Sequence, residues 1–455
     1  MSTSPGEGGI GIVRVSGKEA ILIADRIFVS PAGKLLSSVS LRSVIYGFIK
    51  DPNTSEKIDE VIVVVMKAPK TYTREDVVEI NCHGGLLPLR RILDIVINQG
   101  ARPSEPGEFT RRAFLNGRID LSQAEAVIDV IKAKTVQAER MALQQLEGRL
   151  SAEITVLRDR VAESCALVEA YIDFPEEEVE LPDSAGFISS MQDILERLLA
   201  LSRSFNEGRL FRDGVAMAIV GKPNVGKSSL LNTLLKQDRA IVTDLPGTTR
   251  DIIEESLNID GIPVRIMDTA GIREAHDLAE AEGVRRSFAA IECADIVLAV
   301  YDASCVLDQA DRQLIGKVKN KKTITVLNKW DIHSPAFDSG DADLNIYSAV
   351  KISALRDEGI DALKDAIVVE LLSNKAILRQ DGAPDLLITN VRHKQLVDNA
   401  FVSLSKAKEI FAKGEPLEVT ALFLREALNS LGEIIGVVTT DDILNKIFSE
   451  FCIGK

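Results

Sequence analysis

Cysteine, histidine and aromatic residues are scarce in this sequence of 455 residues. It has 5 cysteines, 4 histidines and 1 tryptophan, and aromatic residues make up 5% of the chain. The cysteines are odd in number, lie far apart and form no Cys-x-x-Cys pair. This pattern argues against a disulfide framework and a zinc site, and it suits a reducing compartment.

Excess positive charge and long apolar runs are also lacking. The formal net charge is −14, so we expect no broad basic coat for nucleic acid, although a local basic patch is compatible with this charge. The start, MSTSPGEGG, has neither the charged nor the apolar region of a signal peptide. No apolar run has the length needed to span a bilayer. We therefore expect a soluble, cytoplasmic protein without membrane contact.

The apolar fraction of 45% is enough for real cores, and the length predicts two or three domains. Residues 1–117 mix a helical pattern with short β-branched runs, and GIGIVRVSG and EVIVVVMKAP are predicted to be strands. Residues 118–210 and 376–455 are helical in pattern, with one long run at 120–174 and a second helix around 188–203. Residues 211–375 alternate short apolar strands with helices, and Asp260-Gly261 predicts a hairpin between two of these strands. This alternation predicts a parallel sheet covered on both faces. We expect it to be inserted into one all-α domain; two separate helical bundles are the alternative.

The strongest motif is GKPNVGKS, residues 221–228. It matches G-x-x-x-x-G-K-[ST], follows the apolar run VAMAIV and opens an apolar-periodic helix, which is the context of a phosphate-binding loop. Backbone N–H groups and the helix dipole favour phosphates there. Lys227 is predicted to reach the β- and γ-phosphates, and the Ser228 hydroxyl to bind Mg²⁺.

Three further segments follow predicted strands in the order of a GTPase domain: DTAG at 268–271, NKWD at 328–331 and SAL at 353–355. Asp268 is predicted to hold the coordination shell of Mg²⁺ in place. Asp331 can accept hydrogen bonds from guanine N1–H and the exocyclic amine, which adenine cannot match, and SAL can offer backbone N–H to guanine O6. Each segment alone also fits an ordinary strand-end loop, but together they favour GTP over ATP.

Between these motifs lies TDLPGTTRD, residues 243–251. Thr249 is expected to contact Mg²⁺ and the γ-phosphate; locally, the segment also fits a solvated turn. The complete predicted GTP-binding set is Asn224, Val225, Gly226, Lys227, Ser228, Ser229, Thr243, Asp244, Leu245, Pro246, Gly247, Thr248, Thr249, Asp268, Thr269, Ala270, Gly271, Asn328, Lys329, Trp330, Asp331, Ser353, Ala354 and Leu355.

A catalytic glutamine is missing. GTPases of the Ras kind orient water with a glutamine after DTAG, but this position is Ile272. The amide carbonyl of Asn224 could bind a monovalent cation that replaces the charge of an arginine finger. Among nearby acids, Glu280 is our choice for positioning water, and the residues alone do not rank it above Glu274 or Glu282. The other interpretation of that acidic stretch is an exposed helix start.

The motifs over roughly residues 213–375 resemble translation-factor-related GTPases. The flanks are more specific: TSPGEGGIGIVRVSG, TREDVVEINCHGG, RPSEPGEFTRRAFLNGRIDLSQAEAV, AYIDFPEEE and the terminal FCIGK. With TDLPGTTRD they resemble the MnmE (TrmE) family of tRNA-modification GTPases over nearly the whole chain. The resemblance implies an α+β tetrahydrofolate-binding domain, then an all-α helical domain with an inserted α/β P-loop GTPase domain. In this family an apolar strand usually precedes TSPGEGG. Only Met1 and Ser2 precede it here, which indicates a truncated strand or a mis-assigned start.

The resemblance also implies a function. Members are potassium-activated GTPases that dimerise through their N-terminal domains. With the FAD-dependent partner MnmG (GidA), in a heterotetramer, they modify C5 of the wobble uridine (position 34) of certain tRNAs to carboxymethylaminomethyl or aminomethyl derivatives. The implied cofactors are GTP, Mg²⁺, K⁺ and 5-formyl- or methylene-tetrahydrofolate, with FAD held only by the partner.

Site residues follow from matching positions. The implied K⁺ ligands are Asn224, Thr243, Leu245 and Thr248. The implied Mg²⁺ ligands are Ser228 and Thr249. Glu280 is implied to position water. The implied folate residues are Arg14, Glu79, Arg118 and Lys455, each of which alone also fits an ordinary surface ion pair.

The terminal FSEFCIGK gives Cys452 as a candidate catalytic thiol, at the end of a helix that Thr440 should cap. Two other functions compete with tRNA modification. One is an RNA-binding ribosome-assembly GTPase without modification chemistry, and the other is a folate-binding regulator with weak GTPase activity.

Overall fold

A computed structural model describes residues 1–4, 6–173, 184–238, 255–267, 289–334, 349–372, 388–451 and 454. The chain divides into two units. The first comprises Met1–Ile128, Gln145–Val179 and Ala421–Lys455, and the second comprises Asp129–Gln144 and Glu180–Thr420. The predicted residues 243–249, 268–271, Glu280, Cys452 and Lys455 lie outside the described part.

An antiparallel sheet of five strands forms the N-terminal part of the first unit, in the order β1-β5-β4-β3-β2. The strands are β1 (Gly8–Ser16), β2 (Phe28–Val29), β3 (Arg42–Lys50), β4 (Lys57–Met66) and β5 (Val77–Gly84). The runs GIGIVRVSG and EVIVVVMKAP, predicted to be strands, form β1 and β4, so those predictions are confirmed.

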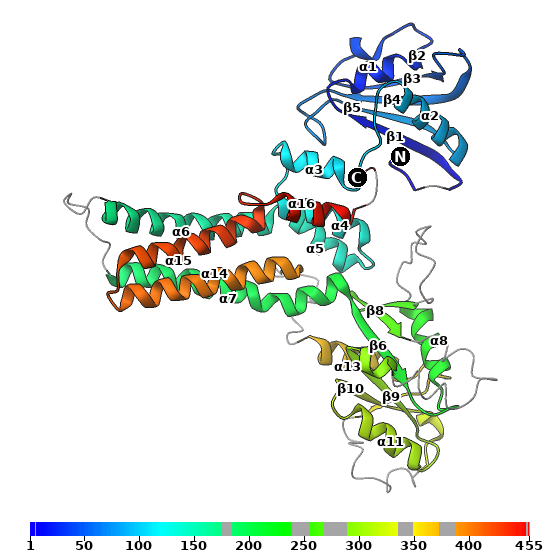
Figure 1. Ribbon diagram of the computed structural model, residues 1–455. Coiled ribbons are helices and arrows are strands. Elements are labelled where there is room, and N and C mark those ends of the chain that lie inside the picture. The colour runs from blue at the N-terminus through cyan, green and yellow to red at the C-terminus, as the bar shows by residue number, and fades with distance from the viewer. Residues whose placement is uncertain are drawn as a thin grey trace. The chain divides into compact units, whose positions relative to one another are not determined.

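Helices α1 (Ala20–Asp25) and α2 (Leu86–Asn98) pack with this sheet (Figure 1). Their apolar side chains share a core with alternate residues of the strands; for example, Ile92 joins Val63 and Ile80. This alternation is the period-2 pattern of a sheet with one buried face. A short 3₁₀ turn, η1 (Leu36–Ser38), completes this part.

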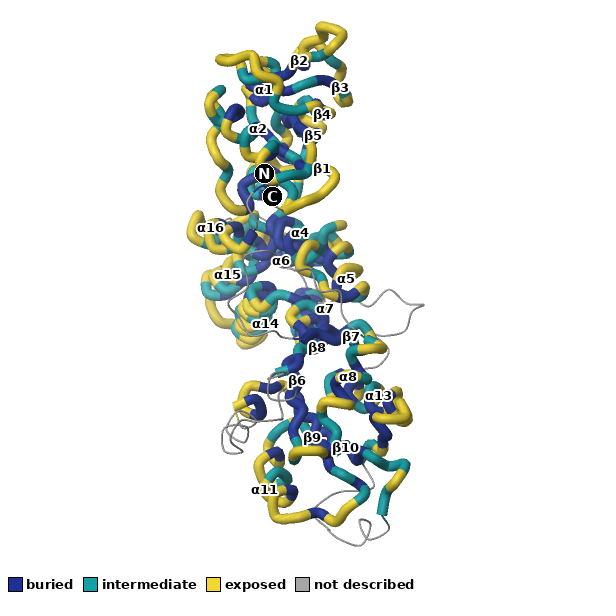
Figure 2. Tube along the Cα trace, turned by 90° about the vertical axis from the view of Figure 1, so that its right-hand side faces the viewer, coloured by how far each residue is buried: buried dark blue, intermediate teal, exposed yellow. Residues whose placement is uncertain are grey.

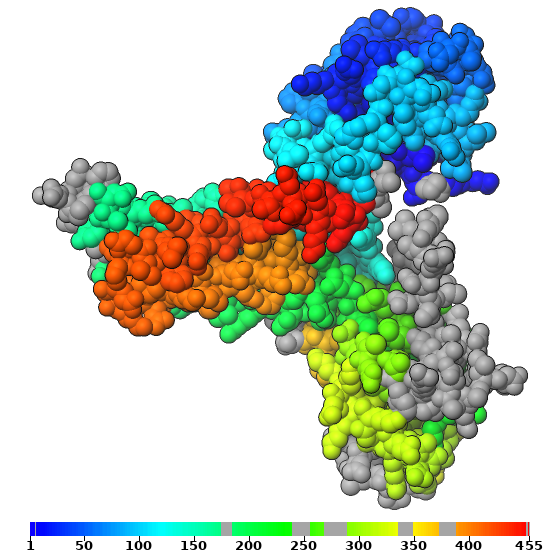
Figure 3. Space-filling view, in the orientation of Figure 1, coloured from blue at the N-terminus to red at the C-terminus, as the bar shows by residue number. Residues whose placement is uncertain are grey.

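The same unit contains α3 (Glu108–Leu115), α4 (Leu121–Lys132) as far as Ile128, α6 (Arg149–Asp173) and α16 (Asp441–Ser449). The Thr440 hydroxyl accepts the Ile443 N–H at 3.5 Å, so the predicted cap is confirmed. Leu444, Phe448 and Phe451 join a cluster that includes Leu121. Figure 3 shows α16 in red beside the cyan residues near 115. Helix α16 and Phe451 are thus packed against α4.

The long helical pattern at residues 120–174 forms three helices, α4, α5 (Val136–Leu146) and α6, rather than one continuous run. Gly148 between α5 and α6 has φ +88°, a value that favours glycine. The predicted helix around residues 188–203 is longer, α7 (Ser184–Asp213).

Helix α14 (Val391–Ala412) packs along α7 in the second unit. The rings of Phe187 and Phe411 lie 4.3 Å apart, and the Ser202 hydroxyl donates to Asp398 Oδ1 at 2.5 Å. Helix α15 (Leu417–Ile435) follows α14 in the chain. No helix among the described residues is long and apolar enough to cross a membrane.

The α/β part is a six-stranded sheet in the order β11-β10-β9-β6-β8-β7. The strands are β6 (Val215–Val220), β7 (Glu255–Ile259), β8 (Ile262–Met267), β9 (Ile296–Asp302), β10 (Thr323–Asn328) and β11 (Val350–Lys351). Only β7 and β8 pair in antiparallel fashion. Asp260 and Gly261 join them with φ +49° and +88°, so the predicted Asp-Gly hairpin is confirmed.

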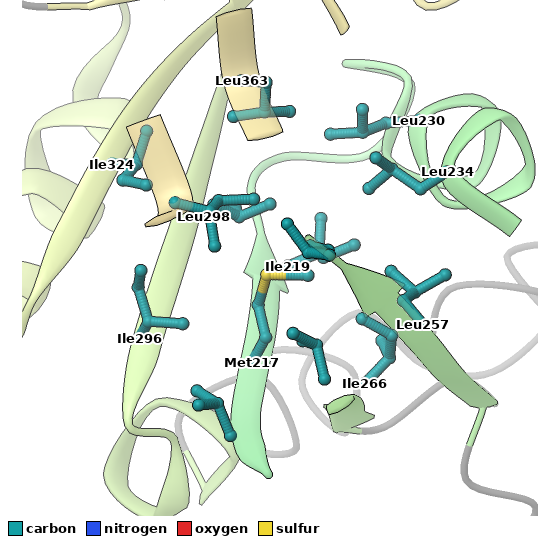
Figure 4. Close-up of a cluster of buried hydrophobic side chains, with 14 of the residues drawn as sticks. Met217, Ile219, Leu230, Leu234, Leu257, Ile266, Ile296, Leu298, Ile324 and Leu363 are labelled. Carbon is teal, nitrogen blue, oxygen red and sulfur yellow. The ribbon is translucent and has the colours of Figure 1, made fainter. Parts of the chain in front are cut away.

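Both faces of this sheet are covered. On one face, Met217 and Ile219 of β6 pack with Leu230 and Leu234 of α8 (Lys227–Asp238), as Figure 4 shows. That core also includes residues of α13 (Ile360–Leu371). On the other face, alternate residues of β6 and β9 belong to a second hydrophobic cluster, which also contains Val318 of α11 (Gln309–Val318). The central strands are accordingly dark blue in Figure 2, as expected of parallel strands.

Candidate nucleotide site and N-terminal polar pair

The phosphate loop follows the strand at which the order of the α/β sheet reverses. Strand β6 has β8 on one side and β9 on the other. Ligands of open α/β sheets bind at the carboxyl ends of strands at such a switch point. The predicted residues 224–229, 328–331 and 353–355 therefore lie at or just after the ends of parallel strands, at one edge of the sheet.

Close backbone packing shapes the loop at residues 221–228. A Cβ on Gly221 would lie 2.4 Å from the Val300 carbonyl, and one on Gly226 would lie 2.1 Å from Asn328 Nδ2. Asn224 has φ +64°, a conformation that asparagine tolerates better than most residues. The Lys227 ammonium donates to the carbonyls of Gly221 at 2.8 Å and Lys222 at 2.7 Å. Burial lowers the pKa of Lys227.

Asn328 joins the phosphate loop to the loop after β11. Its side chain is buried, donates through Nδ2 to the Val225 carbonyl at 2.7 Å, and accepts the Ala354 N–H at Oδ1 at 3.0 Å. Its own carbonyl accepts the Ala303 N–H at 2.9 Å. One residue therefore links segments that follow three strands.

Lys329 and Trp330 are fixed by their neighbours. Lys329 has φ +61°, and its ammonium lies 2.5 Å from Asp302 Oδ2. Burial alone would raise the pKa of Asp302, but hydrogen bonds from Lys329 and Ser304 lower it. The Trp330 ring stacks on His333 at 4.2 Å. Asp302 is a positioning residue that the sequence prediction missed; its place at the end of the strand DIVLAVYD was the available signal.

Asp331, at the start of the 3₁₀ turn η2 (Trp330–Ile332), is nearly covered. Its carboxylate Oδ2 lies 3.2 Å from Arg356 Nε. Arg356 follows the predicted SAL segment, in which Ser353 and Ala354 are buried while Leu355 is 88% exposed. The structure thus brings NKWD, SAL and the phosphate loop together, and adds Arg356, which the sequence prediction did not include.

Lys222, also missed, ties the phosphate loop to α11. Its ammonium lies 2.8 Å from Asp308 Oδ2 and 2.6 Å from Asp311 Oδ2. Burial alone would lower the pKa of Lys222, but these two carboxylates raise it. Asp308 and Asp311 also form the capping box of α11, so one acidic pair fixes both elements.

In the N-terminal sheet, Arg14 and Glu79 face one another across β1 and β5, with Arg14 Nε donating to Glu79 Oε1 at 2.7 Å. The Arg14 guanidinium lies 5.7 Å from the centre of the Phe109 ring. Arg118 is held elsewhere: it donates to the Tyr72 carbonyl at 3.0 Å and lies over the Tyr72 ring. Two of the predicted folate residues are therefore paired, and the third contacts Tyr72.

The C-terminal segment approaches the start of the chain. A Cβ on Gly454 would lie 2.1 Å from the Met1 carbonyl. Burial and the positive charge of Arg14 lower the pKa of the Met1 amine. Gly454, the neighbour of Lys455, thus lies beside the residues that precede β1.

An ion-pair network fixes α3 to this sheet. Arg112 lies 2.8 Å from Glu75 and 2.6 Å from Glu108, and Arg102 also pairs with Glu108. Burial alone would raise the pKa of Glu108, but hydrogen bonds from Arg102, the Glu105 N–H and Arg112 lower it to about 2. The network positions the helix that carries Phe109 beside Arg14.

Among the described thiols, Cys82 and Cys165 are buried and Cys293 and Cys305 are exposed. Burial is the main cause that raises the pKa of Cys82 and of Cys165 to about 11. These two thiols are therefore poor nucleophiles near neutral pH. No cluster of metal-binding side chains occurs among the residues that the structure covers.

The sheet order, the phosphate loop at its switch point and the comparisons with known proteins define the chain as a P-loop GTPase. A model of the MnmE helical domain matches residues 121–452, and a model of the GTP-binding protein TrmE N-terminus matches residues 1–118. The chain therefore belongs to the MnmE (TrmE) family, as the resemblance predicted.

Two relatives that match over the full length of this chain agree with this family. The chain is 46% identical over 458 residues to the tRNA modification GTPase MnmE of Carboxydothermus hydrogenoformans, covering 100% of this chain and 98% of the relative. It is 47% identical over 455 residues to that of Geobacter sulfurreducens, with the same coverage. Among solved structures, Era in complex with MgGDPNP and 16S ribosomal RNA is 28% identical, covering 42% of this chain and 66% of that chain, with a TM-score of 0.27.

The close approach of Gly226 to Asn328 gives a first prediction. In Gly226→Ala, the new methyl group must displace the Asn328 amide, because the two would be 2.1 Å apart. We expect GDP affinity to fall at least about ten-fold, the equivalent of one lost hydrogen bond to a buried group. Titration with a fluorescent GDP analogue measures this.

Gly316→Ala is the matched control, since a Cβ at this position in α11 meets nothing within 4 Å. It should bind GDP like the parent chain. Parental affinity in Gly226→Ala would contradict the proposed coupling of the two loops.

Proposed function

We propose that this chain is a potassium-activated GTPase that modifies tRNA together with an FAD-dependent MnmG partner. The reaction would place carboxymethylaminomethyl or aminomethyl groups on C5 of the wobble uridine, in the cytoplasm. The observation that carries the proposal is similarity along the whole chain, including the N-terminal and helical parts. A GTPase domain alone would fit an assembly factor equally well.

The described loops support roles for individual residues toward GTP. The Lys227 ammonium, which now contacts two loop carbonyls, would move its hydrogen bonds to the β- and γ-phosphates. Ser228 lies in the first turn of α8, and its hydroxyl would bind Mg²⁺ there. The bound Mg²⁺ would shield the charge of the phosphates. Asp331 would accept the guanine N1–H and 2-amino group, and the exposed Leu355 would cover the face of the base.

The potassium site is proposed around Asn224. The chain offers Ile272 in place of a water-orienting glutamine, and its sequence does not mark an arginine finger. Other groups must therefore position the water and supply positive charge near the phosphates. Asn224 is exposed at the tip of the phosphate loop, and its amide makes no hydrogen bond within the described residues. A potassium ion held by this amide and by Thr243, Leu245 and Thr248 would supply charge near the β- and γ-phosphates, while Thr249 contacts Mg²⁺ and Glu280 positions water.

We therefore predict that steady-state GTP hydrolysis is at least about ten-fold faster in K⁺ than in Na⁺ at equal ionic strength, the size of effect expected for one transition-state charge contact. Asn224→Ala should lose this preference while retaining GDP binding. Lys319→Ala, an exposed charge change at the end of α11, should keep it. Equal rates in both salts would exclude the potassium mechanism.

The folate site is proposed at the Arg14–Glu79 pair, with Arg118 and Lys455 as further cations. A carboxylate such as Glu79 can bind the amino and N–H edge of a pterin, and arginine suits the glutamyl carboxylates. The pair is only about one-fifth exposed (22% and 21%) and lies beside an aromatic ring. Gly454, which precedes the proposed Lys455 in the chain, lies beside Met1.

Arg14→Ala should weaken binding of 5-formyl-tetrahydrofolate about ten-fold or more, because it removes one charged partner and leaves Glu79 uncompensated. Isothermal titration calorimetry measures this affinity. Arg91→Ala breaks a more exposed arginine–glutamate pair in the same part of the chain, with Glu56, and should bind folate normally. Unchanged affinity in Arg14→Ala would remove this site.

Homodimerisation is proposed through the N-terminal sheet. The face opposite α1 and α2 presents exposed Val44, Tyr46 and Ile62 from β3 and β4. Exposed apolar groups on one sheet face are typical of an interaction surface. Glu79 pairs with Val64 in the register of β4 and β5, so the proposed folate pair borders this face.

Nucleoside analysis of tRNA tests the proposed function. A strain without this chain should lack the modified wobble uridines, the parent chain should restore them, and Lys227→Ala should not, because the phosphates lose their cation. Gly316→Ala is again the control. If tRNA modification is intact in the deletion strain while ribosomal subunits accumulate unassembled, the assembly-factor alternative is correct.

A further inference from the structure

The carboxylate proposed to select guanine is already bound by a cation in this structure. Asp331 Oδ2 lies 3.2 Å from Arg356 Nε. The Asp331 side chain is 9% exposed, whereas the Arg356 side chain is 57% exposed. The carboxylate is therefore largely covered, and its partner has open space into which it can move.

The backbone of Arg356 is fixed relative to the loop that would face the base. Its N–H donates to the Ser353 carbonyl at 3.2 Å and to the Ser353 hydroxyl at 3.3 Å. Ser353 and Glu358 exchange backbone hydrogen bonds at 3.0 and 3.1 Å, and Asp357 has φ +61° and is held by Gln237. A tight turn thus fixes where the arginine side chain begins, while the end of that side chain stays accessible.

Two kinds of donor compete for one carboxylate. Guanine presents two donors, N1–H and the 2-amino group, and so uses both oxygens of Asp331. Hypoxanthine has N1–H but no 2-amino group and needs only one oxygen. Since Arg356 occupies Oδ2, it conflicts with the second donor of guanine but leaves an oxygen for hypoxanthine.

We propose that Arg356 is a specificity-determining residue that competes with guanine for Asp331 and so reduces the preference of the site for guanine over hypoxanthine nucleotides. The proposal rests on the proposed guanine site. Guanine displaces the arginine on binding, because two donors in a covered site outweigh one partly exposed ion pair. The arginine therefore weakens binding of guanine nucleotides rather than preventing it.

The test measures affinities for GDP and IDP by displacement of a fluorescent GDP analogue from the full chain. In Arg356→Ala we expect GDP to bind roughly two- to five-fold more tightly, as expected for loss of an exposed ion pair, and IDP to change less. The gain should shrink at high salt, because the pair is screened. Arg356→Gln, which keeps most of the side chain, should behave like Arg356→Ala.

Lys319→Ala is the charge-matched control and should leave the ratio of GDP to IDP affinity unchanged. Weaker or unchanged GDP binding in both Arg356 variants would overturn the proposal, as would an equal gain for GDP and IDP. Asp331→Asn separates the two proposals. If Asp331→Asn leaves the ratio of GDP affinity to IDP affinity unchanged, the proposed guanine site itself is wrong. If it removes the preference for GDP while the Arg356 variants match the parent chain, only the proposed competition is wrong.

Discussion

The nucleotide site depends on the hydrogen bonds of one buried amide. Asn328 accepts the Ala354 N–H and donates to the Val225 carbonyl, while its backbone carbonyl accepts the Ala303 N–H. Leaving one such buried group unpaired costs about 1–3 kcal/mol. The loops after β6, β9 and β11 are therefore held in one arrangement, and the sheet register that pairs Asn328 with Asp302 sets where that arrangement lies.

The N-terminal polar pair depends on register in the same way. Arg14 and Glu79 meet because β1 and β5 place them directly opposite, and a shift of either strand by one residue would send its member of the pair to the buried face. The Arg112 network then holds α3, and with it Phe109, beside Arg14. In both parts of the chain, strand pairing brings together side chains that lie far apart in sequence.

Local chemistry explains what could be predicted. The phosphate loop, the Asp260-Gly261 hairpin and the Thr440 cap each depend on a few adjacent residues, and the structure has the expected element at each. The break at Gly148 gave a weaker signal, because a lone glycine does not always end a helix. The break at residues 133–135 has neither glycine nor proline and gave no local signal. Asp302 and Arg356 were missed because each acts on a partner 25 or more positions away, and such pairing is set by the fold.

Charge compensation explains how a chain with net charge −14 can present an anion site. Lys222 is neutralised by Asp308 and Asp311, so it fixes the loop and offers little attraction to a phosphate. Lys227 contacts only carbonyl dipoles among the described residues, and burial makes its charge costly without an anionic partner. A phosphate that replaces those carbonyls restores the missing counter-charge. Among the described residues, attraction to phosphate is therefore concentrated at the Lys227 ammonium and the backbone N–H groups around it.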